Sequence, residues 1–273
     1  MEKRTIKTIH DYECLSFDDE HVFRGESKDC YSLLPSAYRN NSCLKNDGPK
    51  LEIMCVQGFI HHLWQRGYHT FPNDWNEINI LTISSKVFPT EDMLPYMALA
   101  QHYASDSQFF WLKTSLLDVT YSLDIAAYFA VKSNYEHNGK IYVLNKTAIK
   151  PLYGIYEPHM DTRKEARMIV QHGALVYRKQ EYESVGEMYR YKNCKPFDDI
   201  VAETIIIPDI LKEELKEYLR KKLFDSVILP KMILGPMTPD MSSVGIKSFE
   251  EIRNLHIADI EIAENAGNRH SNY

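Results

Sequence analysis

Gly139-Lys140-Ile141-Tyr142-Val143-Leu144-Asn145 alternates and is rich in residues that favour strands. This pattern predicts a β-strand. An amphipathic segment at about 123–133, with Ile125, Ala126, Phe129 and Ala130 on one side, predicts a helix directly before it. Shorter apolar runs predict further strands at 22–24 (ended by Gly25), 174–177, 205–207 (stopped by Pro208) and 227–229.

Three more helices are expected. Leu51, Cys55, Phe59 and Leu63 recur every four residues, and Gly67 is a plausible end to their helix. Thr90 precedes an apolar run and predicts a helix over about 91–103. After Asp209, a helix is expected whose inward side chains are Ile210, Leu211, Leu215, Tyr218, Leu219 and Leu223.

The order of strands and helices is mixed rather than strictly alternating, which favours an α+β fold with small mixed or antiparallel sheets flanked by helices. We find no internal repeat and no low-complexity linker. The chain is therefore expected to form one domain over residues 1–262, followed by a loose tail over 263–273.

The bulk composition is that of a globular protein, with 273 residues of which 44% are hydrophobic. A net charge of −6 disfavours bulk nucleic-acid binding. Five irregularly spaced cysteines without a C-x-x-C pair favour free thiols over a disulfide framework or zinc cluster. With no apolar run long enough for a membrane helix and no signal segment, we expect a cytoplasmic protein that does not enter the membrane.

Several motifs that carry common chemistries are absent from the sequence. There is no Walker loop, G-x-G-x-x-G, H-E-x-x-H or G-x-S-x-G. His61-His62 has no carboxylate or cysteine at a matching spacing, so no metal is expected.

Arg24 is the strongest candidate for a functional residue. It ends an apolar strand, where a charge needs a partner or a ligand. Its planar guanidinium suits phosphate or carboxylate, and Gly25 would let a ligand approach the backbone closely. The alternative is a structural ion pair, which is common in proteins.

Four other elements carry candidate side chains, and each has a simpler explanation. Gln101 and His102 lie at a predicted helix end, and the alternative for His102 is a cap of the helix C-terminus. Asp118, Thr120 and Ser122 share one face if extended, although Thr120 or Ser122 would also suit a helix cap. Tyr128 is equally typical of a core residue, and Gln171 of a hydrogen bond within the fold.

The order of these motifs resembles the FRG-domain family over roughly residues 6–235. The resemblance rests on Phe23-Arg24-Gly25, Leu33-Leu34-Pro35-Ser36, the helix beginning near Leu51, 98–103 (Ala-Leu-Ala-Gln-His-Tyr), 116–120 (Leu-Leu-Asp-Val-Thr), 127–130 (Ala-Tyr-Phe-Ala), Gln171-His172-Gly173 and Ile207-Pro208. The chain departs from the family in having Ser115 and Val119 around Asp118, Leu229-Pro230-Lys231 in place of Phe-Pro-Asp, and a longer segment over 104–113 that contains Phe109-Phe110-Trp111.

A second resemblance is to ADP-ribosyltransferases, which share an early Arg-Gly strand, a Thr/Ser element and a Tyr-Phe-Ala helix followed by a strand. It implies NAD as substrate, with Arg24, Thr120 and Gln171 as catalytic residues and Gly25, Gln101, His102, Asp118, Ser122 and Tyr128 around the ligand. Arg24 would hold the nucleotide and Tyr128 would pack on the nicotinamide. Gln171, Glu183 and Glu203 all lie late enough to supply the ribose-binding acidic position, but none lies in an E-x-E motif.

Three hypotheses follow for the role of Arg24. It anchors NAD in an ADP-ribosyltransferase-like enzyme, it holds a nucleotide or acidic ligand in a non-catalytic module, or it forms a core ion pair.

Overall fold

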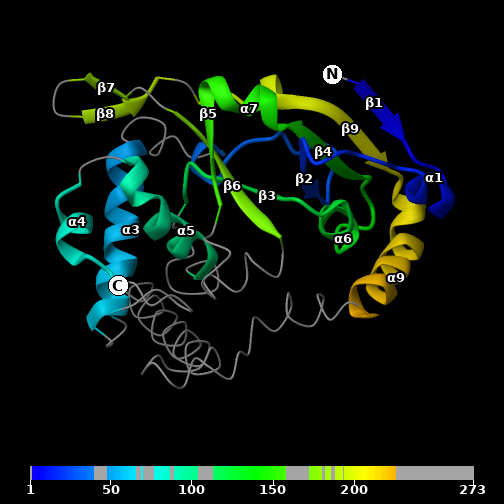
Figure 1. Ribbon diagram of the computed structural model, residues 1–273, viewed down its shortest axis with the longest axis horizontal. Helices are drawn as coiled ribbons and strands as arrows, with labels where there is room; N and C mark the ends of the chain where they lie inside the picture. The colour runs from blue at the N-terminus through cyan, green and yellow to red at the C-terminus, as the bar shows by residue number, and fades with distance from the viewer. Residues whose placement is uncertain are drawn as a thin grey trace, which may run out of the picture.

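A seven-stranded mixed sheet forms the middle of the molecule (Figure 1). The computed structural model describes residues 2–39, 48–65, 69, 77–86, 89–103, 113–157, 172–179, 182–185, 188–192 and 194–225. The strand order is β1-β9-β4-β2-β3-β6-β5, in which only the β1–β9 pair is parallel. The strands are β1 (Glu2–Thr5), β2 (His21–Glu26), β3 (Leu117–Thr120), β4 (Gly139–Asn145), β5 (Tyr153–Tyr156), β6 (Gly173–Arg178) and β9 (Val201–Ile207).

Helices lie at both ends of this sheet, and a separate hairpin accompanies them (Figure 1). The helix α3 (Gly48–Gln65) lies with α4 (Ile80–Ser84) and α5 (Leu94–Tyr103) at one end, whereas α6 (Leu123–Val131) and α9 (Asp209–Asp225) lie at the other. The hairpin pairs β7 (Tyr182–Val185) with β8 (Met188–Tyr191). The shorter helices are α1 (Ile9–Glu13), α7 (Lys146–Leu152) and the 3-10 turns η1 (Ser36–Tyr38), η2 (Glu91–Met93) and η3 (Asp198–Ile200).

Helix α6 packs unusually closely on β2 and β4. A Cβ atom on Gly25 would overlap the Ala126 carbonyl and lie 2.9 Å from the Ala130 nitrogen, and one on Gly139 would lie 2.6 Å from the Ala130 oxygen. Two strand glycines therefore let the helix backbone approach the sheet. Around this contact, Phe23, Ile141, Val143, Ile205 and Ile207 of the sheet form one core with side chains of α6 and α9.

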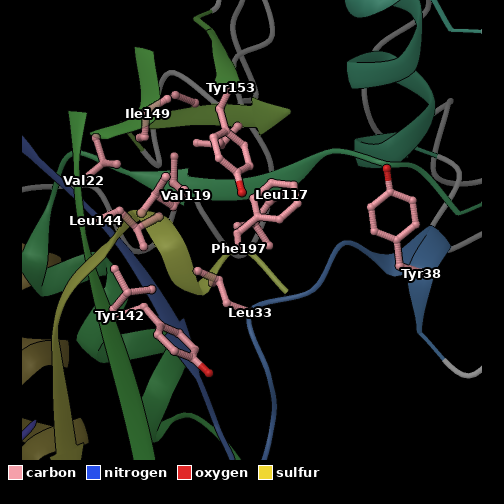
Figure 2. Packing of buried hydrophobic residues seen from close by; sticks show 14 of the residues in the cluster. Val22, Leu33, Tyr38, Leu117, Val119, Tyr142, Leu144, Ile149, Tyr153 and Phe197 are labelled. Atoms are coloured by element: carbon pink, nitrogen blue, oxygen red, sulfur yellow. The ribbon is translucent and has the colours of Figure 1, made fainter. Parts of the chain in front are cut away.

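The opposite face of the central strands is covered by loops and short elements. Val22, Leu117, Val119, Tyr142, Leu144 and Tyr153 of the sheet form one cluster with Leu33, Tyr38, Ile149 and Phe197, and Figure 2 labels these side chains. Strand alternation explains the division, because neighbouring residues such as Val22 and Phe23 point to opposite faces. A third core joins α3, α4 and α5 to Leu116 and Leu175.

The predicted α+β class is confirmed, with a single larger sheet and a hairpin in place of several small sheets. The strand at 22–24 does not end at Gly25 but continues to Glu26. The helix expected over 91–103 is divided into η2 and α5. Ile210 was predicted to face inward, yet it is 89% exposed, because it lies on the outer side of the first turn of α9 while Leu211, Leu215, Leu219 and Leu223 are buried.

The strand expected at 227–229 and the tail over 263–273 lie outside the described residues. No helix within the described part of the chain is both long enough and apolar enough to cross a membrane.

Candidate ligand site around Arg24

Strand β2 sets the position of Arg24. Its backbone pairs with Tyr142 of β4, while β2 pairs in register with β3 only at Phe23 and Thr120. The two strands therefore diverge beside Arg24, and its side chain reaches across to β3. The Arg24 side chain is 17% exposed, so most of the guanidinium is removed from water.

Two carboxylates and a carbonyl surround this guanidinium. Arg24 Nε donates to Glu26 Oε1 at 2.8 Å, and Nη1 donates to the Asp118 carbonyl oxygen at 2.7 Å, with Asp118 Oδ2 at 3.5 Å. Burial alone would lower the pKa of Arg24, but the nearby charges of Glu26 and Asp118 raise it above its ordinary value. Arg24 therefore stays charged. Within the described residues, no hydrogen-bond acceptor occupies Nη2.

Glu26 is the most buried of the charged partners, with a relative exposure of 7%. It also accepts a hydrogen bond from Arg39 Nη2 at 3.3 Å, and Arg39 Nε donates to the Leu34 carbonyl at 2.8 Å. Two guanidinium groups thus share one buried carboxylate. The two positive charges of Arg24 and Arg39 are formally balanced by the carboxylates of Glu26 and Asp118, and the planar guanidinium groups are the feature that suits an anionic ligand.

Asp118 presents a different environment, because its side chain is 49% exposed. Gln101 Nε2 donates to Asp118 Oδ1 at 2.5 Å, and the Thr114 hydroxyl donates to Gln101 Oε1. The amide of Gln101 is therefore held at both ends and fixes one carboxylate oxygen. This arrangement leaves a half-exposed carboxylate, oriented by Gln101, next to a charged guanidinium.

The structure brings Arg24, Gln101 and Asp118 together, and it places the other described candidates on the α6 side. Gly25 faces the Ala126 backbone. Thr120 accepts a hydrogen bond from the Ser122 amide at 3.0 Å, and Ser122 caps α6 by accepting from the Ile125 amide at 3.3 Å. Tyr128 packs against the cores that α6 shares with α9.

The remaining candidates have other positions. Gln171 and the side chain of His102 lie outside the described residues. Glu183 contacts Arg190 within the β7–β8 hairpin. Glu203 pairs with Arg4 at 2.8 Å on β9, which β4 separates from β2.

Sequence reasoning assigned no role to three members of this site: Glu26, Arg39 and Thr114. Glu26 was within reach, since residues i and i+2 of a strand share a face and a carboxylate two residues from Arg24 is a natural partner. Arg39 and Thr114 have no such signal, because tertiary packing alone brings them near.

Two hollows lie outside the Arg24 group. One, of about 480 Å³, is lined by residues that include Phe23, Tyr121, Asp124 and Lys146. The other, of about 370 Å³, is lined by residues that include Leu94, Ser115 and Tyr177. Among the described residues, we find no group of three His, Cys, Asp or Glu side chains suited to a metal ion.

The fold and this site define an α+β protein with a charged network at the divergence of two central strands. Residues 19–139 match the family model of the FRG domain, and this segment includes Arg24, Gln101 and Asp118. The chain thus contains an FRG domain, as the order of its motifs predicted. Neither the curated proteins nor the solved structures include a match to this chain.

Proposed function

We propose that the site around Arg24 binds NAD and that the protein is an ADP-ribosyltransferase-like enzyme, which transfers ADP-ribose or hydrolyses NAD. The observation that carries the proposal is the Asp118 carboxylate, half exposed, held by Gln101 and adjacent to Arg24. Asp118 is proposed as the acidic group, because Glu183 pairs with Arg190 and Glu203 pairs with Arg4 away from this site.

Arg24 would bind the pyrophosphate through Nη2. The guanidinium is fixed by Glu26 and the Asp118 carbonyl, so little side-chain entropy is lost when an anion binds. Arg39 adds a second positive charge beside Glu26.

Asp118 would act on the ribose. When the bond between C1′ and the nicotinamide nitrogen breaks, its electron pair goes to nicotinamide, which leaves as a neutral molecule. The ribose carbon becomes oxocarbenium-like, and a nearby carboxylate stabilises that positive charge. Water or an acceptor group then forms the new bond to C1′, and its proton passes to Asp118 or to solvent.

The test measures NAD consumption and the transfer of label from adenylate-labelled NAD to lysate macromolecules. We expect Arg24→Ala to lose NAD binding. Asp118→Asn is expected to retain binding while turnover falls by roughly 10²–10³-fold, as on removal of other charge-stabilising groups. Arg220→Ala is the matched control, because Arg220 lies exposed on α9 and pairs only with Glu217 among the described residues. Absence of both NAD binding and consumption in the unmodified protein would eliminate the proposal.

A second candidate is a non-catalytic module that holds a nucleotide or acidic ligand in the same place. The observation that favours it is that both carboxylate oxygens of Asp118 accept hydrogen bonds, one from Gln101 and one from Arg24. Such contacts are also typical of a carboxylate with a structural role. This candidate predicts that ADP-ribose raises the melting temperature without any turnover, and that Arg24→Ala abolishes the rise. Consumption of NAD would decide against it.

A further inference from the structure

Glu52 is a carboxylate in the interior that the proposed reaction does not use. It lies on α3 and its relative exposure is 0%. A buried carboxylate is costly unless donors satisfy its oxygens, so its partners show what it holds in place.

Glu52 joins three separate parts of the fold. Its Oε1 accepts hydrogen bonds from the Ser115 amide at 2.7 Å and the Ser115 hydroxyl at 2.9 Å, and its Oε2 accepts one from the Tyr191 hydroxyl. The ring of Tyr191 in turn packs against the start of α3, where a Cβ on Gly48 would lie 2.8 Å from it. One carboxylate therefore links α3, β8 and the segment that leads into β3.

The segment held by Glu52 is the one that orients the site. Ser115 follows Thr114, whose hydroxyl donates to Gln101, and Gln101 donates to Asp118. The connection from Glu52 to the half-exposed Asp118 carboxylate thus runs through the Ser115–Glu52 hydrogen bonds, the peptide unit between Thr114 and Ser115, and the hydrogen bonds from Thr114 to Gln101 and from Gln101 to Asp118.

We propose that Glu52 is a positioning residue of the Arg24 site, whose carboxylate fixes Ser115 and thereby the Gln101 amide against Asp118. The identity of the ligand rests on the proposed function. The positioning of Gln101 by Glu52 rests only on the hydrogen bonds described above. Its protonation is expected to loosen the hold on Ser115, because a neutral carboxyl group accepts hydrogen bonds less strongly.

The surroundings of Glu52 make that protonation accessible near neutral pH. All three donors are neutral, and the titratable groups that the described residues place against Glu52 are Tyr191 of β8 and Cys55 of α3. Burial raises the pKa of Glu52 to about 7, although the hydrogen bonds from Tyr191 and Ser115 oppose the shift.

The experiment follows the side-chain amide resonances of Gln101 in the ¹⁵N-labelled full chain, identified by their loss in Gln101→Ala. In the unmodified protein we expect them to shift with pH around a midpoint of about 7. In Glu52→Gln, which imitates the protonated acid, they should keep their low-pH positions at every pH. Tyr191→Phe removes a donor to the carboxylate, so its midpoint should move to higher pH. Glu217→Gln on the exposed face of α9 is the control and should behave like the unmodified protein.

Binding of ADP-ribose is measured in parallel. We expect Glu52→Gln to weaken the affinity about tenfold, because Gln101 and Asp118 are then held less firmly. The positioning role is wrong if the Gln101 resonances do not shift with pH in the unmodified protein. It is also wrong if they shift with pH by the same amount in Glu52→Gln. If Glu52→Gln does not fold, the midpoint in Tyr191→Phe decides the question. If ADP-ribose does not bind to the unmodified protein while Gln101 responds as expected, the proposed function fails and the positioning role stands.

Discussion

At the scale of single residues, Arg24 forms a structural ion pair, and the proposed function adds the role of a ligand anchor. Its Nε donates to Glu26 and its Nη1 donates to the Asp118 carbonyl oxygen. A structural ion pair and a ligand anchor are therefore compatible here, because the fork of a guanidinium can serve a partner with one side and a ligand with another.

Glu52 predicts how stability depends on pH. Its pKa is raised in the folded protein, from 4.5 to about 7, so the folded state binds the proton more tightly than the unfolded state does. The contribution of this group is largest below about pH 4.5 and declines as the pH rises to about 7. This rise in pKa corresponds to a contribution of about 3 kcal/mol to the free energy of unfolding.

Glu52→Gln should remove this dependence. We expect the difference in free energy of unfolding between Glu52→Gln and the unmodified protein, measured in urea, to change by up to about 3 kcal/mol between pH 4.5 and 7.5. A constant difference across this range would show that Glu52 titrates normally.

At the scale of elements, the contact between α6 and β2 makes a strong prediction about Gly25. Gly25→Ala would push a methyl group into the Ala126 carbonyl, and the obstacle is helix backbone rather than a flexible side chain. Overpacking of this kind costs about 1–3 kcal/mol or more in free energy of unfolding.

The matched control for this prediction is Gly58→Ala, at an exposed position of α3 with no atom within 4 Å of the new methyl group. It should raise stability, by up to about 1 kcal/mol, through helix propensity. Urea unfolding compares the two variants, and equal effects would contradict the close packing of α6.

The elements also show where sequence reasoning succeeds. Strand β4 and helices α6 and α9 were predicted nearly residue by residue, since each has a strong apolar period that burial then reinforces. Strand β5 and hairpin β7–β8 were missed, because four-residue strands carry little periodicity and owe their pairing to distant partners. For the proposed site, residue chemistry singled out Arg24, Gln101 and Asp118, which the structure brings into contact, whereas Glu52 and Thr114 depend on contacts that no local pattern encodes.

At the scale of the whole molecule, Lys212 of α9 connects three distant segments. It is completely buried, and its Nζ donates to the carbonyl oxygens of Ser27 at 3.0 Å, Ser133 at 2.7 Å, Asn134 at 2.8 Å and His137 at 3.2 Å. The ammonium thus ties α9 to the loops that follow β2 and α6.

Lys212→Met keeps the aliphatic stem and removes the ammonium. We expect it to lower the free energy of unfolding by about 3 kcal/mol or more, because four partly buried carbonyl groups lose their donor. Lys221→Met on the exposed side of the same helix should stay within about 0.5 kcal/mol of the unmodified protein. Equal stabilities of the two variants in urea would rule out the anchoring role of Lys212.

The parallel pairing of β1 with β9 has a consequence for synthesis of the protein. Glu2 pairs with Glu203, and Thr5 pairs with Ile206, so the partner of β1 leaves the ribosome about 200 residues later. During translation, β1 therefore has no strand partner at a time when β2, β3 and β4 have all been synthesised and can pair with one another. The pairing of β1 with β9 is therefore a late event in folding. A nascent chain whose synthesis stops before Val201 would expose the edge of β4 that β9 normally covers.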